Sequence, residues 1–234
     1  MQAVIPAAGR GSRLGALTAD RPKGLVEIAG QPLLAAVFDR AVEAGADELV
    51  VVIGYEGAQI VERFGDSFRE TPITYVHQRE RRGLAHAVLQ AEPHVTGAFL
   101  VVNGDNVFAE SLQPAVAALH REGVDGVIAV EDVSRDTASR TGVVKLAGET
   151  VARIVEKPTA PSSTLVTTGC FVLPDATFEA CKLVQPSAEG EYQLSEAVSL
   201  LARAGYAIAT VRVGERVNVN TQADIERAEA LVQD

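Results

Sequence analysis

The stretch AVIPAAGRGSRL at residues 3–14 decides the fold of this chain, and Pro22-Lys23 follows it closely. The apolar run at 3–5 predicts a buried strand that leads into a loop of small residues. Such a loop brings backbone N–H groups close to phosphate oxygens, and Arg13 and Lys23 add positive charge there. An ordinary turn with a solvated Arg13 is the alternative for the loop alone. We expect the loop to bind a nucleoside triphosphate through Ala7, Ala8, Gly9 and Gly11.

The spacing of the glycines disfavours two common phosphate-binding loops. A dinucleotide-binding fingerprint needs its third glycine at position 14, where this chain has Leu14. No Walker A lysine follows the loop either. Hydride-transfer enzymes and P-loop enzymes are therefore poor candidates.

Apolar runs that predict buried strands alternate along the chain with segments of helical periodicity. The runs lie at 48–53 and 98–102, and the helical segments at 32–45, 83–91 and 112–120. This alternation indicates βαβ units in a doubly wound sheet.

The pattern changes from residue 134 onward. Strand-like runs follow with few helices between them, at 143–146, 151–155 and 166–173. A helix is predicted over 191–204, and a closing helix over 221–232 should begin at Thr221 with Asp224 at the capping-box position. We predict an α/β fold in one domain over 1–234: a Rossmann-like, doubly wound mixed sheet, predominantly parallel, with a small antiparallel portion.

The composition excludes several classes of partner. The formal net charge is −10, which argues against nucleic acid and anionic membrane surfaces as partners. No run approaches the roughly 18 apolar residues that span a bilayer, and no signal peptide is visible. Cys170 and Cys181 lack metal-ligand spacing. We expect a reduced, cytoplasmic protein.

Three residues beyond the loop suggest specific chemistry. Asp105 follows a buried strand, where a carboxylate beside phosphates suits Mg²⁺, although a turn aspartate is the alternative. The Gln78 carboxamide can pair with the edge of a pyrimidine ring, and Gly83 lets the backbone approach a base closely. An exposed glutamine and a helix-start glycine are the alternatives for these two.

The loop and several later segments together resemble the sugar-1-phosphate nucleotidyltransferases. The matching segments are Ala7 to Leu14 with Pro22-Lys23, Gln78 with Gly83 to Ala87, Gly104 to Asn106, Glu156 to Pro158, Thr168-Gly169 and Gly190 to Glu196. The resemblance implies a Rossmann-like nucleotide-binding sheet and a divalent metal, Mg²⁺. It also implies attack of a sugar phosphate on an α-phosphate, with loss of pyrophosphate.

The resemblance assigns roles to the matching residues. Gln78 and Gly83 would lie against the nucleobase, while Arg13 and Lys23 would stabilise the triphosphate and the departing pyrophosphate. Lys157 would hold the phosphate of the sugar phosphate. The nucleotide-binding part would be about 1–130 and the sugar-binding part about 131–234. The sugar would be contacted or supported by Glu156, Thr168, Gly169 and Glu191.

The segment at 216–221, RVNVNT, departs from the family pattern. Relatives commonly have Trp before an Asp-Val/Ile-Gly-Thr-Pro run, whose Asp is the second metal ligand. Here Asn218 takes the Asp position, as in the bacterial N-acetylglucosamine-1-phosphate uridylyltransferases, which use Asn for this role. An Asn carbonyl can bind Mg²⁺ without charge, so we expect Asp105 and Asn218 to hold the metal.

The predicted reaction is nucleotidyl transfer from dTTP or UTP to a sugar 1-phosphate, which gives an NDP-sugar and pyrophosphate. One alternative is a cytidylyltransferase acting on a non-sugar phosphate, since IPAAG at 5–9 and Asn220-Thr221 resemble that class. The Asp-Ala-Ala-Arg-Pro segment of those enzymes is absent from the sequence. A non-catalytic sensor of nucleotide sugars is the other alternative, because Asn218 leaves it open. A homo-oligomer is possible, and the sequence specifies neither base nor sugar.

Overall fold

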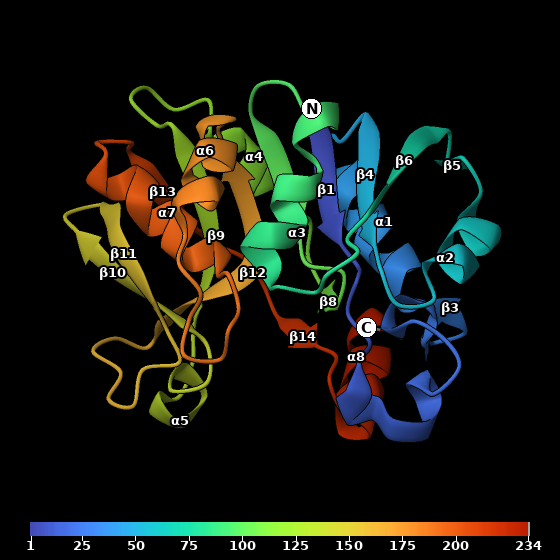
Figure 1. Cartoon of the computed structure of the whole chain (residues 1–234). Coiled ribbons are helices and arrows are strands. Elements are labelled where there is room, and N and C mark those ends of the chain that lie inside the picture. Colours follow the sequence, from blue (N-terminus) through green and yellow to red (C-terminus); the bar gives the residue numbers. More distant parts are fainter. Residues whose placement is uncertain (234) are drawn as a thin grey trace.

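A ten-stranded sheet forms the centre of the molecule in the computed structural model, which describes residues 1–233 (Figure 1). Its strand order is β10-β11-β13-β9-β12-β7-β1-β4-β6-β5. These strands are β1 (Gln2–Pro6), β4 (Glu48–Ile53), β5 (Ser67–Phe68), β6 (Thr71–His77), β7 (Phe99–Val102), β9 (Gly126–Asp132), β10 (Gly142–Ala147), β11 (Thr150–Glu156), β12 (Leu165–Leu173) and β13 (Ile208–Arg212).

The helices and two small sheets complete the fold. The α-helices are α1 (Leu33–Glu43), α2 (Gly57–Phe64), α3 (Leu84–Gln90), α4 (Gln113–Ala118), α5 (Arg135–Ala138), α6 (Ala176–Leu183), α7 (Leu194–Arg203) and α8 (Gln222–Gln233). Short 3₁₀ helices are η1 (Ser12–Thr18), η2 (Lys23–Leu25) and η3 (Glu92–His94). The small sheets pair β2 (Glu27–Ile28) with β3 (Gln31–Pro32), and β8 (Asn106–Phe108) with β14 (Arg216–Asn218).

The block β7-β1-β4-β6 is parallel throughout, as the alternation predicts. Ala3 to Ile5 in β1 are fully buried, with Ala3 in register with Leu49 of β4 and Leu100 of β7. Parallel strands place their carboxyl ends at one edge of the sheet. The opening loop, Gln78 and Asn103 therefore all follow strands that end at the same edge.

The second half of the sheet is mixed, which confirms the predicted fold class. Strand β12 runs antiparallel to both β7 and β9, while β9 and β13 are parallel to each other. Strands β10 and β11 form an antiparallel hairpin. The run at 166–173 thus joins a parallel block to an antiparallel one.

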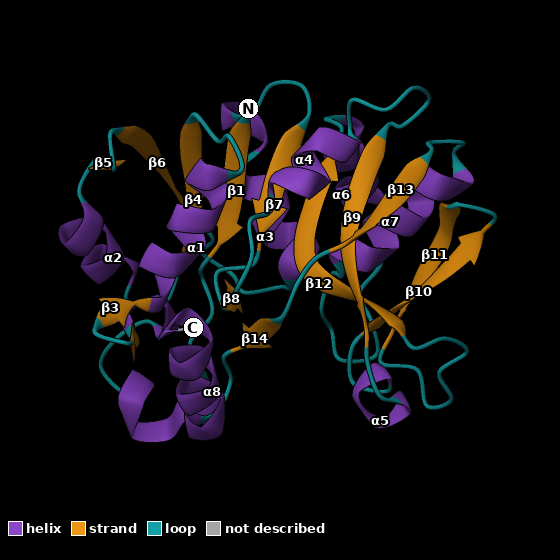
Figure 2. Cartoon of the chain, turned by 180° about the vertical axis from the view of Figure 1, so that it is seen from behind, coloured by secondary structure: helices purple, strands orange, loops and turns teal. Residues whose placement is uncertain are grey.

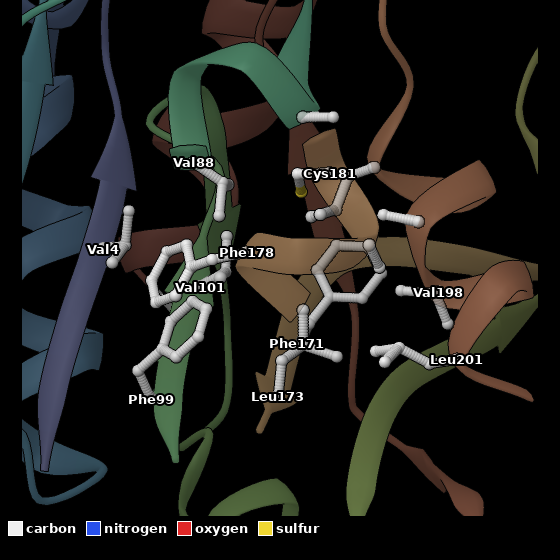
Figure 3. Packing of buried hydrophobic residues seen from close by; sticks show 14 of the residues in the cluster. Val4, Val88, Phe99, Val101, Phe171, Leu173, Phe178, Cys181, Val198 and Leu201 are labelled. Carbon is white, nitrogen blue, oxygen red and sulfur yellow. The ribbon is translucent and has the colours of Figure 1, made fainter. Parts of the chain in front are cut away.

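Helices cover both faces of the sheet because successive strand residues point to opposite sides. On one face, Phe99, Phe171 and Phe178 pack with residues of α3, α6 and α7 (Figure 3). On the other face, α1, α2 and α4 contribute to a cluster around Phe38 and Leu100 (Figure 2).

A third, smaller cluster lies below the carboxyl edge of the parallel block, where α8 and the opening segment meet (Figure 2). We call it the lower cluster, and its buried members are Leu14, Val26, Ile28, Leu33, Val107, Val217, Val219, Ile225 and Ala228. In this cluster, residues of the opening loop, β8, β14 and α8 pack against one another. These four segments surround the candidate site.

Some elements differ from the sequence prediction. The helix predicted over 191–204 begins at Leu194, because the backbone of Tyr192 instead pairs with the loop before α3. The Tyr192 amide donates to Arg82 and its carbonyl accepts from Ala85. Helix α6 was not predicted, and the three-residue strands β8 and β14 are too short to show a hydrophobic period.

Candidate active site

A cavity of about 320 Å³ opens where β1 and β7 end. The predicted residues that line it are Ala7, Gly9, Gly11, Arg13, Lys23 and Asp105. Ala8 does not line this cavity, since it is buried. Arg13 is exposed and makes no ion pair within residues 1–233, so its charge is available to a ligand.

The opening loop follows a path that requires glycine at position 11. Gly11 has φ +69°, and a Cβ atom there would lie 2.9 Å from Cβ of Lys23. The Gly11 carbonyl accepts from the Thr18 hydroxyl at 2.8 Å, which closes the loop on η1. The loop therefore packs directly on the Lys23 side chain.

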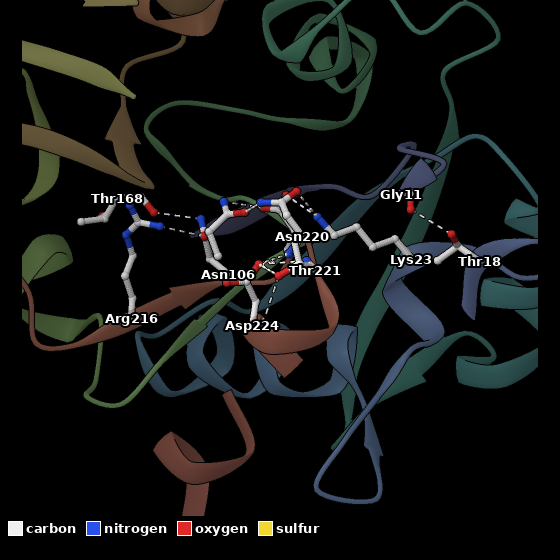
Figure 4. A network of polar contacts seen from close by, with 11 residues as sticks. Gly11, Thr18, Lys23, Asn106, Thr168, Arg216, Asn220, Thr221 and Asp224 are labelled. Atoms are coloured by element: carbon white, nitrogen blue, oxygen red, sulfur yellow. Dashed lines mark hydrogen bonds and ion pairs between the residues drawn. The ribbon is translucent and has the colours of Figure 1, made fainter. Parts of the chain in front are cut away.

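Lys23 lines this cavity, and its side chain extends toward Asn220 (Figure 4). Its Nζ donates to Asp105 Oδ2 at 2.9 Å and to Asn220 Oδ1 at 3.1 Å. The Lys23 side chain is 11% exposed and that of Asp105 is 32% exposed. An ammonium group thus lies between the end of the central strand and the segment that precedes α8.

Pairing of β8 with β14 brings Asn218 to Asp105, although the two residues are far apart in sequence. Asn218 is in register with Asn106, and the Val219 amide donates to the Asp105 carbonyl at 2.9 Å. Asn218 Nδ2 donates to Asp105 Oδ1 at 3.4 Å. Asn220 Nδ2 in turn donates to Asn218 Oδ1.

A capping box at the start of α8 fixes the position of Asn220. The Thr221 amide donates to Asp224 Oδ2 at 2.8 Å, and the Asp224 amide donates back to Thr221 Oγ1 at 3.3 Å. The Asn220 amide donates to the same Asp224 oxygen at 3.0 Å. The predicted cap is therefore present, and it also holds a residue that contacts Lys23.

The oxygen atoms at this point suit a hard cation. Asp105 supplies a carboxylate, while Asn218 and Asn220 supply carbonyl oxygens. Residues 1–233 hold no cluster of three or more His, Cys, Asp or Glu side chains that could bind a metal. One carboxylate with neutral oxygens and substrate phosphates is a normal Mg²⁺ environment, so these residues fit that ion.

A second cavity, of about 190 Å³, adjoins the first and shares Leu84 and Asn103 with it. Among the predicted residues, Glu156, Thr168, Gly169 and Asn218 line it. Burial raises the pKa of Glu156, although a hydrogen bond with Ser195 and the charge of Lys157 oppose the shift. The Thr168 hydroxyl donates to the Ala129 carbonyl at 3.0 Å and so has a structural partner already.

Five predicted residues lie outside both cavities, namely Ala8, Gln78, Gly83, Lys157 and Glu191. Lys157 has φ +39° and its Nζ lies 2.5 Å from Glu189 Oε2 in an exposed ion pair. Glu191 is exposed, and its Cβ lies 3.0 Å from where a Cβ on Gly83 would stand. The structure thus puts Glu191 beside the loop before α3, and its negative charge also acts on the carboxyl group of Glu156.

Gln78 and Gly83 lie together at the end of β6. Gln78 is buried, and its Nε2 donates to the Gly83 carbonyl at 3.2 Å. Gly83 has φ +101°, and a Cβ on it would lie 2.7 Å from the Tyr192 carbonyl. Only glycine fits this close approach.

Two side chains that sequence reasoning did not assign also line the second cavity. Asn103 Oδ1 and Arg216 Nε are buried without a hydrogen-bond partner among residues 1–233. Arg216 pairs with Glu131 at 2.7 Å and donates to Asn106 Oδ1. Nothing in the sequence distinguished Asn103, and the departure of residues 216–221 from the family pattern drew attention to Asn218 rather than to Arg216.

Comparison with known proteins places this chain in a family. A model described as nucleotidyl transferase matches residues 2–215. The chain belongs to the nucleotidyl transferase family. The prediction that it is a nucleotidyltransferase is confirmed. Residues 1–233 contain no helix long and apolar enough to cross a bilayer.

Individual relatives support the assignment. UTP–glucose-1-phosphate uridylyltransferase AglF of Haloferax volcanii is 45% identical over 237 residues, which cover 100% of this chain and 97% of the relative. The bifunctional protein GlmU of Methanocaldococcus jannaschii is 33% identical over 87% of this chain, which spans only 47% of that protein. A putative glucose-1-phosphate thymidylyltransferase from Bacillus anthracis has the same fold, with a TM-score of 0.90, 24% identity and coverage of 100% and 96%.

Proposed function

We propose that this enzyme transfers a uridylyl group from UTP to glucose 1-phosphate or a similar sugar 1-phosphate, which gives a UDP-sugar and pyrophosphate. The observation that carries the proposal is the pair of adjoining cavities, one with cationic residues and one with the half-buried carboxylate of Glu156. The choice of UTP and glucose is supported by the 45% identity to a relative that is named for them. dTTP is the second candidate nucleotide, and the assay below distinguishes the two.

The reaction needs no general base, because the sugar phosphate is already an anion at neutral pH. Its difficulty is the repulsion between two phosphate groups that must align for in-line attack. A phosphate oxygen of the sugar phosphate forms a bond to the α-phosphorus of UTP, and the bond to the β-phosphate oxygen breaks. Pyrophosphate leaves with that bonding pair.

Arg13 and Lys23 are proposed to offset the charge of the triphosphate and of the leaving pyrophosphate. Arg13 lines the first cavity with its charge available, and the loop amides from Ala7 to Gly11 approach the same space. Lys23 is held by Asp105 and Asn220, so its ammonium is already ordered before substrate binds. Ordering in advance reduces the entropic cost of catalysis.

Asp105 and Asn218 are proposed to hold Mg²⁺, with Asn220 adjacent. When bound, the ion would neutralise phosphate charge. Asp105 would contribute its carboxylate and Asn218 its carboxamide oxygen, with the ammonium group of Lys23 beside them.

The sugar is proposed to occupy the second cavity. Glu156 would accept hydrogen bonds from sugar hydroxyls, Gly169 and the Thr168 backbone would form the wall, and Glu191 would support the pocket from the loop before α7. Lys157 would bind the sugar phosphate after leaving Glu189. That exposed ion pair stabilises its geometry by only about 0–1 kcal/mol, so a doubly charged phosphate competes with it readily.

The proposed division of labour follows the chain, with about 1–130 for the nucleotide and about 131–234 for the sugar. Asn220 lines the first cavity, and Asn103 and Asn106 line the second, so each part of the chain also contributes residues to the cavity of the other part.

Cys170 and Cys181 are buried free thiols, in line with a reduced cytoplasmic setting. A homo-oligomer remains a proposal to be measured in solution.

Product analysis tests the proposal. Purified protein with Mg²⁺ is incubated with UTP, dTTP or CTP and a panel of sugar 1-phosphates, and products are identified by mass. We expect a UDP-sugar and one pyrophosphate per turnover. CDP products formed from non-sugar phosphates would favour a cytidylyltransferase, and tight UDP-sugar binding without any pyrophosphate would favour a sensor.

A further inference from the structure

The Gln78 carboxamide has its nitrogen atom fixed by two neighbours. Its side chain is 4% exposed, and Nε2 lies 3.2 Å from the Gly83 carbonyl oxygen and 2.9 Å from Nδ1 of His86. A carbonyl oxygen can only accept a hydrogen bond, so the atom that faces Gly83 must be the NH₂ group. The same NH₂ group then faces His86. The Nδ1 atom of His86 must therefore accept a hydrogen bond from Gln78, and the ring proton of His86 lies on Nε2.

This arrangement leaves only the oxygen of Gln78 for a ligand. An NH₂ group has two protons, and Gly83 and His86 take one each. The free atom, Oε1, accepts hydrogen bonds and cannot donate. It matches the N3–H group of uracil or thymine, whereas N3 of cytosine carries a lone pair and would oppose it.

The Gly83 carbonyl alone holds the carboxamide weakly. It also accepts the Ala87 amide at 3.1 Å in the first turn of α3, so Gln78 shares this acceptor. The shorter contact of Gln78 is the one to His86. His86 is half-buried on α3 and lines neither cavity, whereas Leu84, two positions earlier, lines both.

We propose that His86 is a positioning residue that keeps the Gln78 oxygen turned toward the base and thereby selects uracil or thymine over cytosine. The inference rests on the proposed function and on the role that the family resemblance implies for Gln78 and Gly83, which is contact with the nucleobase. His86 does not touch the substrate. It acts through the orientation of one carboxamide.

The charge state of His86 is suited to this role. Burial lowers the pKa of His86, and the positive charge of Arg82 lowers it further, while Glu80 opposes the shift. The ring is therefore neutral at neutral pH, and Nδ1 can accept. Protonation would place a second N–H group against the Gln78 NH₂ group and turn the carboxamide over.

Equilibrium binding of UTP and CTP tests this without requiring turnover. The dissociation constants of both nucleotides are measured by calorimetry with Mg²⁺ for wild type and three variants. His86→Phe removes the acceptor but keeps a ring, and His86→Asn offers a carbonyl oxygen near the position of Nδ1. His77→Phe is the matched control, because His77 is exposed and is the last residue of β6, directly before Gln78. Melting temperatures show that each variant is folded.

We expect wild type and His77→Phe to prefer UTP strongly. In His86→Phe the ratio of the CTP to the UTP dissociation constant should fall about tenfold, as expected for the loss of one hydrogen bond. His86→Asn should restore much of that ratio. The preference of wild type should also fall in acid as His86 becomes protonated, while that of His86→Phe should not change. A structural effect alone would weaken both nucleotides equally.

Two results would overturn the inference in distinguishable ways. If wild type binds CTP as well as UTP, the base assignment in the proposed function is wrong and the inference fails with it. If wild type prefers UTP and His86→Phe keeps the full preference, the proposed function stands and only the role of His86 is contradicted.

Discussion

At the scale of single residues, Arg13 provides the sharpest test of the triphosphate site. It is exposed and lines the first cavity, so little of the fold depends on it. Arg13→Ala should lower kcat by about a hundredfold or more, the cost typical of removing one charge-stabilising donor. The melting temperature should stay unchanged. Steady-state rates and thermal unfolding measure both, and near-normal turnover would remove Arg13 from the mechanism.

Replacing the Glu156 carboxylate should stabilise the folded protein and weaken its binding of the sugar phosphate. Its raised pKa in the folded state means that the ionised carboxylate is penalised by burial. This cost is absent in acid, grows as pH rises through the ordinary carboxyl pKa and is complete above the folded-state pKa. Glu156→Gln should therefore melt at a higher temperature than wild type at neutral pH, while its KM for the sugar phosphate rises.

The pH dependence provides the control for that substitution. The difference in melting temperature between Glu156→Gln and wild type should disappear below the ordinary carboxyl pKa, where both side chains are neutral. A variant that is destabilised at neutral pH would contradict the burial argument. An unchanged KM would contradict the placement of the sugar beside Glu156.

At the scale of elements, the capping box of α8 connects helix stability to the site. Burial raises the pKa of Asp224, but hydrogen bonds from Thr221 and the Asn220 backbone outweigh it and lower the pKa overall. Asp224→Ala should cost about 1 kcal/mol of unfolding free energy. It should also lower kcat/KM for UTP, because Asn220 loses its backbone partner beside Lys23. The stability difference should shrink in acid as Asp224 becomes protonated.

Glu226→Ala is the matched control, since Glu226 is an exposed acid on the same helix. Urea unfolding and kinetics of the two variants separate the effects. Equal activity in Asp224→Ala and Glu226→Ala would mean that the cap serves only the helix.

Elements with a strong pattern could be predicted from sequence, and those made by tertiary pairing could not. The buried runs of β1, β4 and β7 and the cap at Thr221 carry local signals that the structure reproduces. By contrast, β14 has three residues and exists because it pairs with β8. That pairing decides where Asn218 lies. The start of α7 was misjudged for a similar reason, since Tyr192 pairs with the distant residues Arg82 and Ala85.

The same distinction holds for site residues. Asp105 was predictable because it follows a buried strand at the ligand-binding edge of the sheet. Asn103 and Arg216 were not, because their importance lies in buried polar atoms that face a cavity. Lys157 and Glu191 show the converse case, in which motif residues lie outside the cavities that the structure contains.

At the scale of the whole molecule, the site exists because the two ends of the chain meet. The lower cluster packs Leu14 and Val26 near the start against Val217 and Ile225 near the end. Above it, Lys23 reaches both Asp105 of the central strand and Asn220 before α8. The first cavity, proposed to bind the nucleotide, is therefore complete only in the fully folded chain.

The central step of the proposed reaction is the attack of a sugar phosphate on the α-phosphorus of UTP. Its most direct test uses glucose 1-phosphate whose phosphate oxygens are all heavy oxygen, with unlabelled UTP and Mg²⁺, followed by mass analysis of both products. We predict that UDP-glucose keeps every heavy oxygen and that pyrophosphate carries none. Heavy oxygen in the pyrophosphate would contradict this step. Release of the heavy oxygen as free inorganic phosphate would contradict it too.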